Sequence, residues 1–220
     1  MMLARTTEKF ILELRENNHK EWFDAHRDAY LAAKADYENT VQHILDGLAA
    51  QDATMEALQV KDCTFRIYKD VRFSKDKTPY KTNMGAAFQA GGKKSLSAGY
   101  YFHYEPGGHS FAGGGLWMPA APELKKVRQE IDYNFDEFEA IIKAKDFKKY
   151  FGTLGGETLK TIPQGYTADN PAIDVLRHKS FIVDHHLTDE TCTRSGLVKE
   201  ILKSFAAMQP LLAFLNRALE

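Results

Sequence analysis

Apolar residues recur at helical spacing through the first part of the chain. Over residues 22–48 they follow one another at steps of three or four, which is the stripe of a long amphipathic helix. Asn18, with Glu21 three positions later, resembles a capping box, so we predict that this helix begins at Asn18. A shorter helix is predicted over residues 8–15. The pattern therefore predicts a helical region over residues 1–60.

The period then changes from helical to two. Over residues 63–73 the odd positions are apolar apart from Lys69, which is typical of a half-buried strand. We predict a strand here, with Arg66 and Arg72 on its outward face. The side chains predicted to be buried in this strand are Phe65, Ile67, Val71 and Phe73.

Three further strands are predicted, at residues 84–89, 97–105 and 110–117. Short connections rich in Gly and Pro join them, which favours an antiparallel meander within a strand-rich region over residues 63–118. The last strand contains three consecutive glycines, residues 113–115, and no helix follows them directly, unlike a dinucleotide-binding fingerprint. We expect a ring or a neighbouring backbone to approach closely there, or the glycines to line the floor of a pocket.

Helical periodicity returns over residues 122–150 and again over residues 195–219. Residues 152–194, between these helices, are punctuated by Gly, Pro and Asp and predict loops with a short strand near residues 180–183. The chain shows no linker and no internal repeat. We therefore predict a single α+β domain over residues 1–220, with a mainly antiparallel sheet packed with amphipathic helices.

Composition agrees with a packed protein, since 44% of the 220 residues are hydrophobic. No apolar run approaches the ~20 residues that a membrane span needs, and the first residues lack the apolar stretch of a signal peptide. Cys63 and Cys192 are too few for a disulfide framework or a thiolate zinc site. We expect a cytoplasmic protein that does not enter a membrane, and we predict no metal site.

Charge is distributed unevenly although the net charge is only −1. Residues 1–62 carry seven Lys and Arg against twelve Asp and Glu, a net of −5, whereas residues 63–94 carry eight against two, a net of +6. A concentrated basic stretch in a neutral protein favours a local anion site over a general nucleic-acid surface. We therefore expect no tight binding to duplex DNA.

The basic stretch supplies most of the candidate ligand-binding residues. Arginine offers paired donors that suit phosphate or carboxylate, and lysine adds a point charge. We predict that Arg72 is the main anion-binding group, with Lys77 and Lys81 folding back from the loop that follows and Tyr80 adding a hydroxyl. Arg66 is predicted to support them. The full set of candidate ligand-binding residues is Arg72, Lys77, Lys81, Tyr80, Lys75, Arg66 and His103.

Two alternative interpretations of these cations remain. In the first, Arg66 and Arg72 pair with acidic side chains of the N-terminal helical region, so that the cluster is structural. In the second, the same cations contact the phosphates of a nucleic acid. The sequence assigns no catalytic residue, reaction, cofactor or oligomeric state.

His103 lies in an aromatic segment, on the same side of its predicted strand as Tyr101. One interpretation is a general base, which requires a positioned partner. The other is a hydrogen-bonded structural histidine.

Four segments carry a resemblance to a known family. They cover residues 17–23, residues 66–82, residues 113–119 and residues 159–166, and the second of them, which reads RIYKDVRFSKDKTPYKT, is the most specific. In this order and spacing they resemble the bacterial and fungal family known as domain of unknown function 2461. Lys69 stands where comparable members often have Arg. The resemblance implies a single cytoplasmic domain and no established activity, and it directs attention to the basic stretch.

Overall fold

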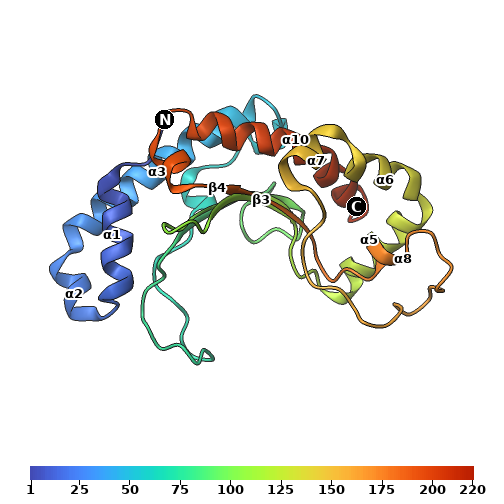
Figure 1. Ribbon diagram of the computed structural model, residues 1–220, viewed down its shortest axis with the longest axis horizontal. Coiled ribbons are helices and arrows are strands. Elements are labelled where there is room, and N and C mark those ends of the chain that lie inside the picture. The colour runs from blue at the N-terminus through green and yellow to red at the C-terminus, as the bar shows by residue number, and fades with distance from the viewer. The chain divides into compact units, whose positions relative to one another are not determined.

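The structure, a computed structural model, describes all 220 residues (Figure 1). Its strands are β1 (Met84–Phe88), β2 (Gly99–Tyr104), β3 (Ser110–Leu116) and β4 (Phe181–Leu187). They form one antiparallel sheet in the order β1-β2-β3-β4, so the predicted α+β class and meander are confirmed. The helices are α1 (Arg5–Glu16), α2 (Lys20–Ala25), α3 (Arg27–Ala49), α4 (Val60–Cys63), α5 (Ala121–Tyr133), α6 (Phe135–Lys143), α7 (Lys145–Phe151), α8 (Ile173–Leu176), α9 (Asp189–Thr193) and α10 (Leu197–Arg217), with a short 3-10 helix, η1 (Ala53–Met55). None of them has the length and apolar character that crossing a bilayer would require.

Contacts between residues group the chain into two compact units. Unit 1 comprises residues 1–93, 101–112 and 186–203, and unit 2 comprises residues 94–100, 113–185 and 204–220. The cations of the basic stretch up to Lys93, His103 and the helices α1 to α4 all belong to unit 1.

Helix α3 forms the helical core of unit 1. Its buried side chains, among them Ala33, Tyr37 and Val41, repeat at the predicted spacing. Helix α1 packs beside it, and the start of α1 is tied to Asp36, whose carboxylate accepts hydrogen bonds from the backbone N–H of Ala4 and the hydroxyl of Thr7 at 2.9 and 2.6 Å.

The long helix predicted from Asn18 is two helices, α2 and α3. The chain leaves helical geometry at His26, with φ −111° and ψ 25°, and the His26 ring donates a hydrogen bond to the Trp22 carbonyl oxygen at 2.8 Å. The N-cap of α2 is His19 rather than Asn18. Asn18 instead accepts from the N–H of Tyr80 and donates to its carbonyl oxygen, at 3.1 and 2.9 Å. The predicted helix start at Asn18 is wrong because the Asn18 side chain makes these two hydrogen bonds to the Tyr80 backbone instead.

The two faces of strand β2 differ in burial. Phe102 is fully buried against α3, where the Tyr37 hydroxyl donates to the Phe102 carbonyl oxygen at 3.1 Å and the two rings stack at 5.6 Å. Tyr101 and His103 point to the opposite face and are only half-buried. We call this second face, with Phe111 of β3, the Tyr101 face.

The strand predicted over residues 63–73 is absent. Cys63 ends helix α4, and the following residues make only isolated bridges, Thr64 to Ala86 and Tyr68 to Tyr80. Of the four side chains predicted to be buried, only Ile67 is, at 4% exposure, whereas Phe73 is 93% exposed. Val71 is half-buried and Phe65 is exposed.

Local side-chain hydrogen bonds explain why this segment does not continue a strand. Asp70 accepts from the backbone N–H of Arg72, and Asp76 accepts from the N–H of Thr78, at 3.3 and 2.9 Å. Such turns compete with the backbone ladder of a sheet. The alternating pattern therefore marks an extended loop rather than a half-buried strand.

In unit 2, the three consecutive glycines allow the backbones of neighbouring strands to approach closely. This confirms one of the two expectations for these glycines. A Cβ atom on Gly114 would lie 2.5 Å from the Gly99 carbonyl oxygen, and one on Gly115 would overlap the carbonyl oxygen of Phe181. The glycines therefore allow strands on both sides of β3 to pack closely. The segment predicted to be loop-rich, residues 152–194, holds α8, β4 and α9.

Both cysteines are buried in unit 1, and burial raises the pKa of each thiol to about 11. At pH 8 only about one thiol in a thousand would then be ionised, and the thiolate is the reactive form. We expect iodoacetamide to label neither Cys63 nor Cys192 in the native protein, and to label both after unfolding in guanidinium. Mass spectrometry of intact protein measures this, and rapid native labelling of either thiol would contradict the structure.

Candidate functional site

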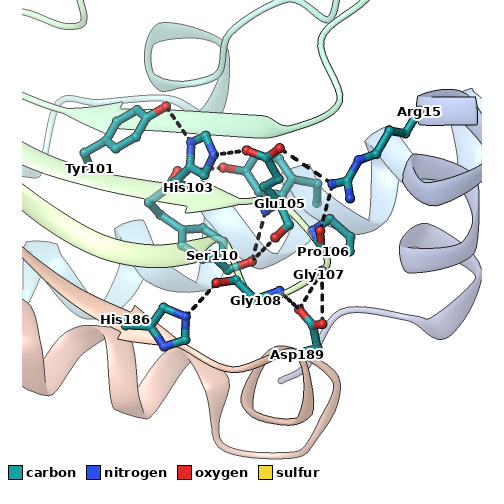
Figure 2. A network of polar contacts seen from close by, with 12 residues as sticks. Arg15, Tyr101, His103, Glu105, Pro106, Gly107, Gly108, Ser110, His186 and Asp189 are labelled. Atoms are coloured by element: carbon teal, nitrogen blue, oxygen red, sulfur yellow. Dashed lines mark hydrogen bonds and ion pairs between the residues drawn. The ribbon is translucent and has the colours of Figure 1, made fainter. Parts of the chain in front are cut away.

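Two side chains of β2 and one that directly follows this strand form a polar row on the Tyr101 face (Figure 2). Tyr101, His103 and Glu105 lie two residues apart, so an extended backbone turns them to the same side. The Tyr101 hydroxyl lies 3.3 Å from His103 Nδ1, and His103 Nε2 lies 3.0 Å from a Glu105 carboxylate oxygen. Because a carboxylate only accepts, Nε2 carries a proton, and in the neutral imidazole Nδ1 accepts from the Tyr101 hydroxyl.

Neighbouring elements fix the orientation of this row. The Phe111 ring of β3 stacks on the His103 imidazole, with centroids 4.8 Å apart and planes at 14°. From α1, Arg15 Nη2 lies 3.6 Å from the second carboxylate oxygen of Glu105 and donates to the Pro106 carbonyl oxygen at 2.8 Å. His103 is therefore held by a stacked ring on one side and by an anchored carboxylate at one nitrogen.

The turn between β2 and β3 is itself pinned in unit 1. Asp189, the first residue of α9, accepts from the backbone N–H groups of Gly107 and Gly108 at 3.0 to 3.2 Å. His186 Nε2 donates to the Gly108 carbonyl oxygen at 2.7 Å. Both glycines have positive φ, 94° and 80°, which lets successive N–H groups face one carboxylate. This network therefore holds the end of the strand that carries Glu105.

Strand β1 makes room for the Tyr101 hydroxyl. A Cβ atom on Gly85 would lie only 2.5 Å from that oxygen, so a larger residue would displace the phenol. Burial, and secondarily Glu105, raises the pKa of Tyr101. The phenol is therefore protonated at neutral pH and provides a hydrogen-bond donor.

Cations gather beside Tyr101, around the ring of Phe65. The Lys81 and Lys93 ammonium groups lie 5.6 and 5.9 Å from the centre of that ring, and the Phe65 and Tyr101 rings are 6.4 Å apart. We call Phe65, Arg66, Lys81 and Lys93 the Lys81 cluster. Cations over an aromatic face are stabilised by its quadrupole, which helps to hold these like charges near one another.

Lys81 differs from Lys93 in having no polar partner. Lys93 Nζ donates to the carbonyl oxygens of Lys61 and Thr64, both at 2.8 Å. Burial, and secondarily the nearby Arg66 guanidinium, lowers the pKa of Lys81. Neither Lys81 nor Arg66 has a carboxylate within ion-pair distance. Within the Lys81 cluster, Lys81 is therefore a half-buried positive charge without a counter-ion, with the exposed Arg66 nearby.

Four other cations of the basic stretch lie in a loop, residues 69–78. Arg72 pairs with Asp70 at 2.6 Å and Lys69 with Asp76 at 2.8 Å, while Lys77 donates to the Val71 carbonyl oxygen at 2.9 Å. Lys75 is exposed. These ion pairs form within the loop, and the structure shows no ion pair between Arg66 or Arg72 and the acidic side chains of the N-terminal helical region, which the structural alternative required.

Tyr80 lies in the core rather than on this surface. It is 3% exposed, and its ring stacks on Phe23 with centroids 4.0 Å apart. Of the seven predicted ligand-binding residues, the structure places Lys81 at the Phe65 ring, with Arg66 near it, and His103 at the hydroxyl of the neighbouring Tyr101. It places Arg72, Lys75 and Lys77 in the loop.

Sequence reasoning missed four residues of this arrangement, Arg15, Glu105, Phe65 and Lys93. Glu105 had a usable signal, because it follows His103 by two positions in a predicted strand. The sequence gives no such signal for Arg15, because it lies 90 residues before Glu105 and contacts it only through the packing of α1. No group of three or more His, Cys, Asp or Glu side chains is arranged to hold a metal ion.

Comparisons with known proteins agree with the resemblance found in the four sequence segments. Searches of curated proteins and of solved structures each find no match. A family model, described as "Conserved hypothetical protein (DUF2461)", matches residues 6–214, which is nearly the whole chain. The chain therefore belongs to the DUF2461 family of conserved hypothetical proteins.

Proposed function

We propose that this protein binds a small phosphorylated or carboxylated ligand on the Tyr101 face, between the Lys81 cluster and the row of Tyr101, His103 and Glu105. The observation that carries this proposal is the half-buried Lys81 ammonium, which sits near Arg66 without a carboxylate partner. An uncompensated charge in such a place is costly unless an anion joins it. The two free, buried thiols fit a reducing compartment, which supports a cytoplasmic location.

The donors around Phe65 and Tyr101 suit an anion of this kind. Arg66 offers a planar fork and Lys81 a point charge, and together they would neutralise a phosphate or a carboxylate. The Tyr101 ring lies next to the Phe65 ring, and its hydroxyl would be a neutral donor once it leaves His103 Nδ1. The exposed Phe65 ring would provide an apolar surface for the rest of the ligand.

Thermal unfolding with inorganic phosphate, or with succinate as a dicarboxylate, tests the proposal. A ligand at about a hundred times its Kd stabilises the native state by about 2.7 kcal/mol, which corresponds to a rise in Tm of about 5–10 °C for a chain of this size. Sodium chloride at matched ionic strength is the control. If neither anion raises the Tm beyond the chloride control, the proposal is wrong.

An anion on this face would have to compete with His103 for the Tyr101 hydroxyl. That hydroxyl donates to His103 Nδ1, so it can donate to an anion only when this hydrogen bond is exchanged. His103 is also contacted by Glu105, with Arg15 behind it, and by the ring of Phe111. We therefore expect the binding of an anion to change the surroundings of the His103 ring.

A further inference from the structure

The loop of residues 69–78 extends from a short, hydrogen-bonded base. The Lys69 N–H donates to the Pro79 carbonyl oxygen and the Lys81 N–H to the Ile67 carbonyl oxygen, at 2.9 and 2.7 Å, on either side of the bridge from Tyr68 to Tyr80. Beyond this base the chain runs away from the strands and helices of unit 1, as the turquoise segment of Figure 1 shows. The loop is therefore anchored at its ends and accessible along its length.

The loop carries one aromatic side chain that is almost fully exposed to solvent, Phe73. Phe73 is 93% exposed, the highest value among the exposed large hydrophobic side chains. Tyr68, at the base of the loop, is 44% exposed. A fully exposed phenylalanine contributes nothing to the core, so the fold itself gives no reason for a ring at this position.

Positive charge surrounds this ring. The Arg72 guanidinium lies 5.8 Å from the centre of the Phe73 ring. Lys75 has no acidic partner, and Lys77 donates only to a carbonyl oxygen, so both retain uncompensated charge. Residues 66–81 carry six cations and two acids, a net of +4. Exposed rings that alternate with cations match the alternation of bases and phosphates along a single nucleic-acid strand.

We propose that this loop binds single-stranded nucleic acid, with a base stacked on Phe73 and the flanking phosphates at Lys75 and Lys77, while Arg72 stays paired with Asp70. The proposal is independent of the small-anion site, because it uses none of the Lys81 cluster. A duplex fits less well, since its bases are already stacked inside and the loop offers few phosphate contacts. A membrane surface also fits less well, since Asp70 and Asp76 flank the one apolar ring and would repel anionic lipid.

Fluorescence anisotropy of a labelled oligothymidylate of about 12 nucleotides, titrated with the full chain at about 50 mM salt, tests this. We expect saturable binding that weakens with salt, with a slope of about −1.4 in log affinity against log salt for two phosphate contacts. Phe73→Ala should weaken binding about tenfold or more, as expected for loss of one stacked base. Phe73→Tyr, which keeps the ring, should restore it.

Trp117→Ala is the matched control, because Trp117 is also an exposed aromatic residue, at 68%, but lies outside the basic stretch. It should leave the affinity unchanged, and the melting curves of both alanine variants should match that of the wild type. Four results would overturn the proposal. They are the absence of binding, equal loss in Trp117→Ala, duplex DNA bound as tightly as the single strand, and binding only to vesicles of anionic lipid.

Discussion

Replacing Lys81 with methionine is expected to weaken phosphate binding at least about tenfold while leaving the ligand-free protein as stable as the wild type. The loss follows from removal of a charge-assisted hydrogen bond at a half-buried position. Stability should hold because methionine can still pack on the Phe65 ring and because a repulsion between Lys81 and Arg66 disappears. Calorimetric titration and urea unfolding of the same preparation measure the two quantities.

Lys75→Met provides the matched control, since it removes the same charge from an exposed position in the same basic stretch. Its effect on phosphate affinity should stay within about twofold, because exposed charges are screened by water and salt. Equal losses in the two variants would mean that general charge, rather than the Lys81 cluster, attracts phosphate. An unchanged affinity in Lys81→Met would show that phosphate binds elsewhere.

Replacing Gly115 with alanine is expected to destabilise the protein by about 4 kcal/mol or more, which in practice means little folded material. The new methyl group would overlap the carbonyl oxygen of Phe181 and would lie 2.8 Å from the Cα atom of Ile182. Both are backbone atoms of β4 and its start, so relief would require the strands to separate. The positive φ of Gly115, 122°, adds strain for any other residue.

Gly165→Ala is the control that distinguishes steric overlap with the neighbouring strand from the strain of a positive φ. Gly165 also has a positive φ, 92°, but a Cβ atom there would meet nothing within 4 Å. We expect a loss of only about 1–2 kcal/mol, the usual penalty for the left-handed conformation. Urea unfolding followed by circular dichroism compares the two variants. If both lose the same free energy, close packing of the strands around Gly115 contributes nothing.

The elements that the sequence predicted correctly are those whose periodicity reflects one buried face. In α3 the buried side chains follow the predicted steps, and in β2 the even residues are buried while Tyr101 and His103 are half-buried. Strand β1 also appeared near its predicted bounds, over Met84–Phe88. Burial of one face imposes its period on the sequence, so the pattern is sufficient there.

Periodicity predicted the wrong structure where the alternation of apolar and polar residues had another cause. Residues 63–73 alternate, but Asp70 and Asp76 tie the following residues into turns, and Phe73 ends in solvent. Alternation does not distinguish a half-buried strand from an extended loop whose apolar residues meet different surroundings. The break at His26 was missed for a related reason, since it depends on a ring-to-backbone hydrogen bond that leaves the apolar spacing intact.

The candidate site was only partly predictable. Lys81 and His103 were expected as ligand-binding residues, but the structure separates them from Arg72 and Lys77, which were expected beside Lys81. Contacts that depend on tertiary packing, such as Arg15 with Glu105 and Phe65 with Tyr101, join residues that are far apart in the chain. Sequence spacing carries no information about such pairs.

The most direct test of the proposed site is to follow the histidine ring signals by NMR during a sulfate titration. The eight histidines can be distinguished by variants, with His103→Gln identifying the relevant signal. His43 is the internal reference, because it is exposed on α3 and bonded only to the Asn39 carbonyl oxygen. We predict that sulfate shifts the His103 signal saturably, leaves His43 in place, and loses this effect in Lys81→Met. If sulfate binds without shifting the His103 signal, or shifts it equally in Lys81→Met, the proposed site on the Tyr101 face is wrong.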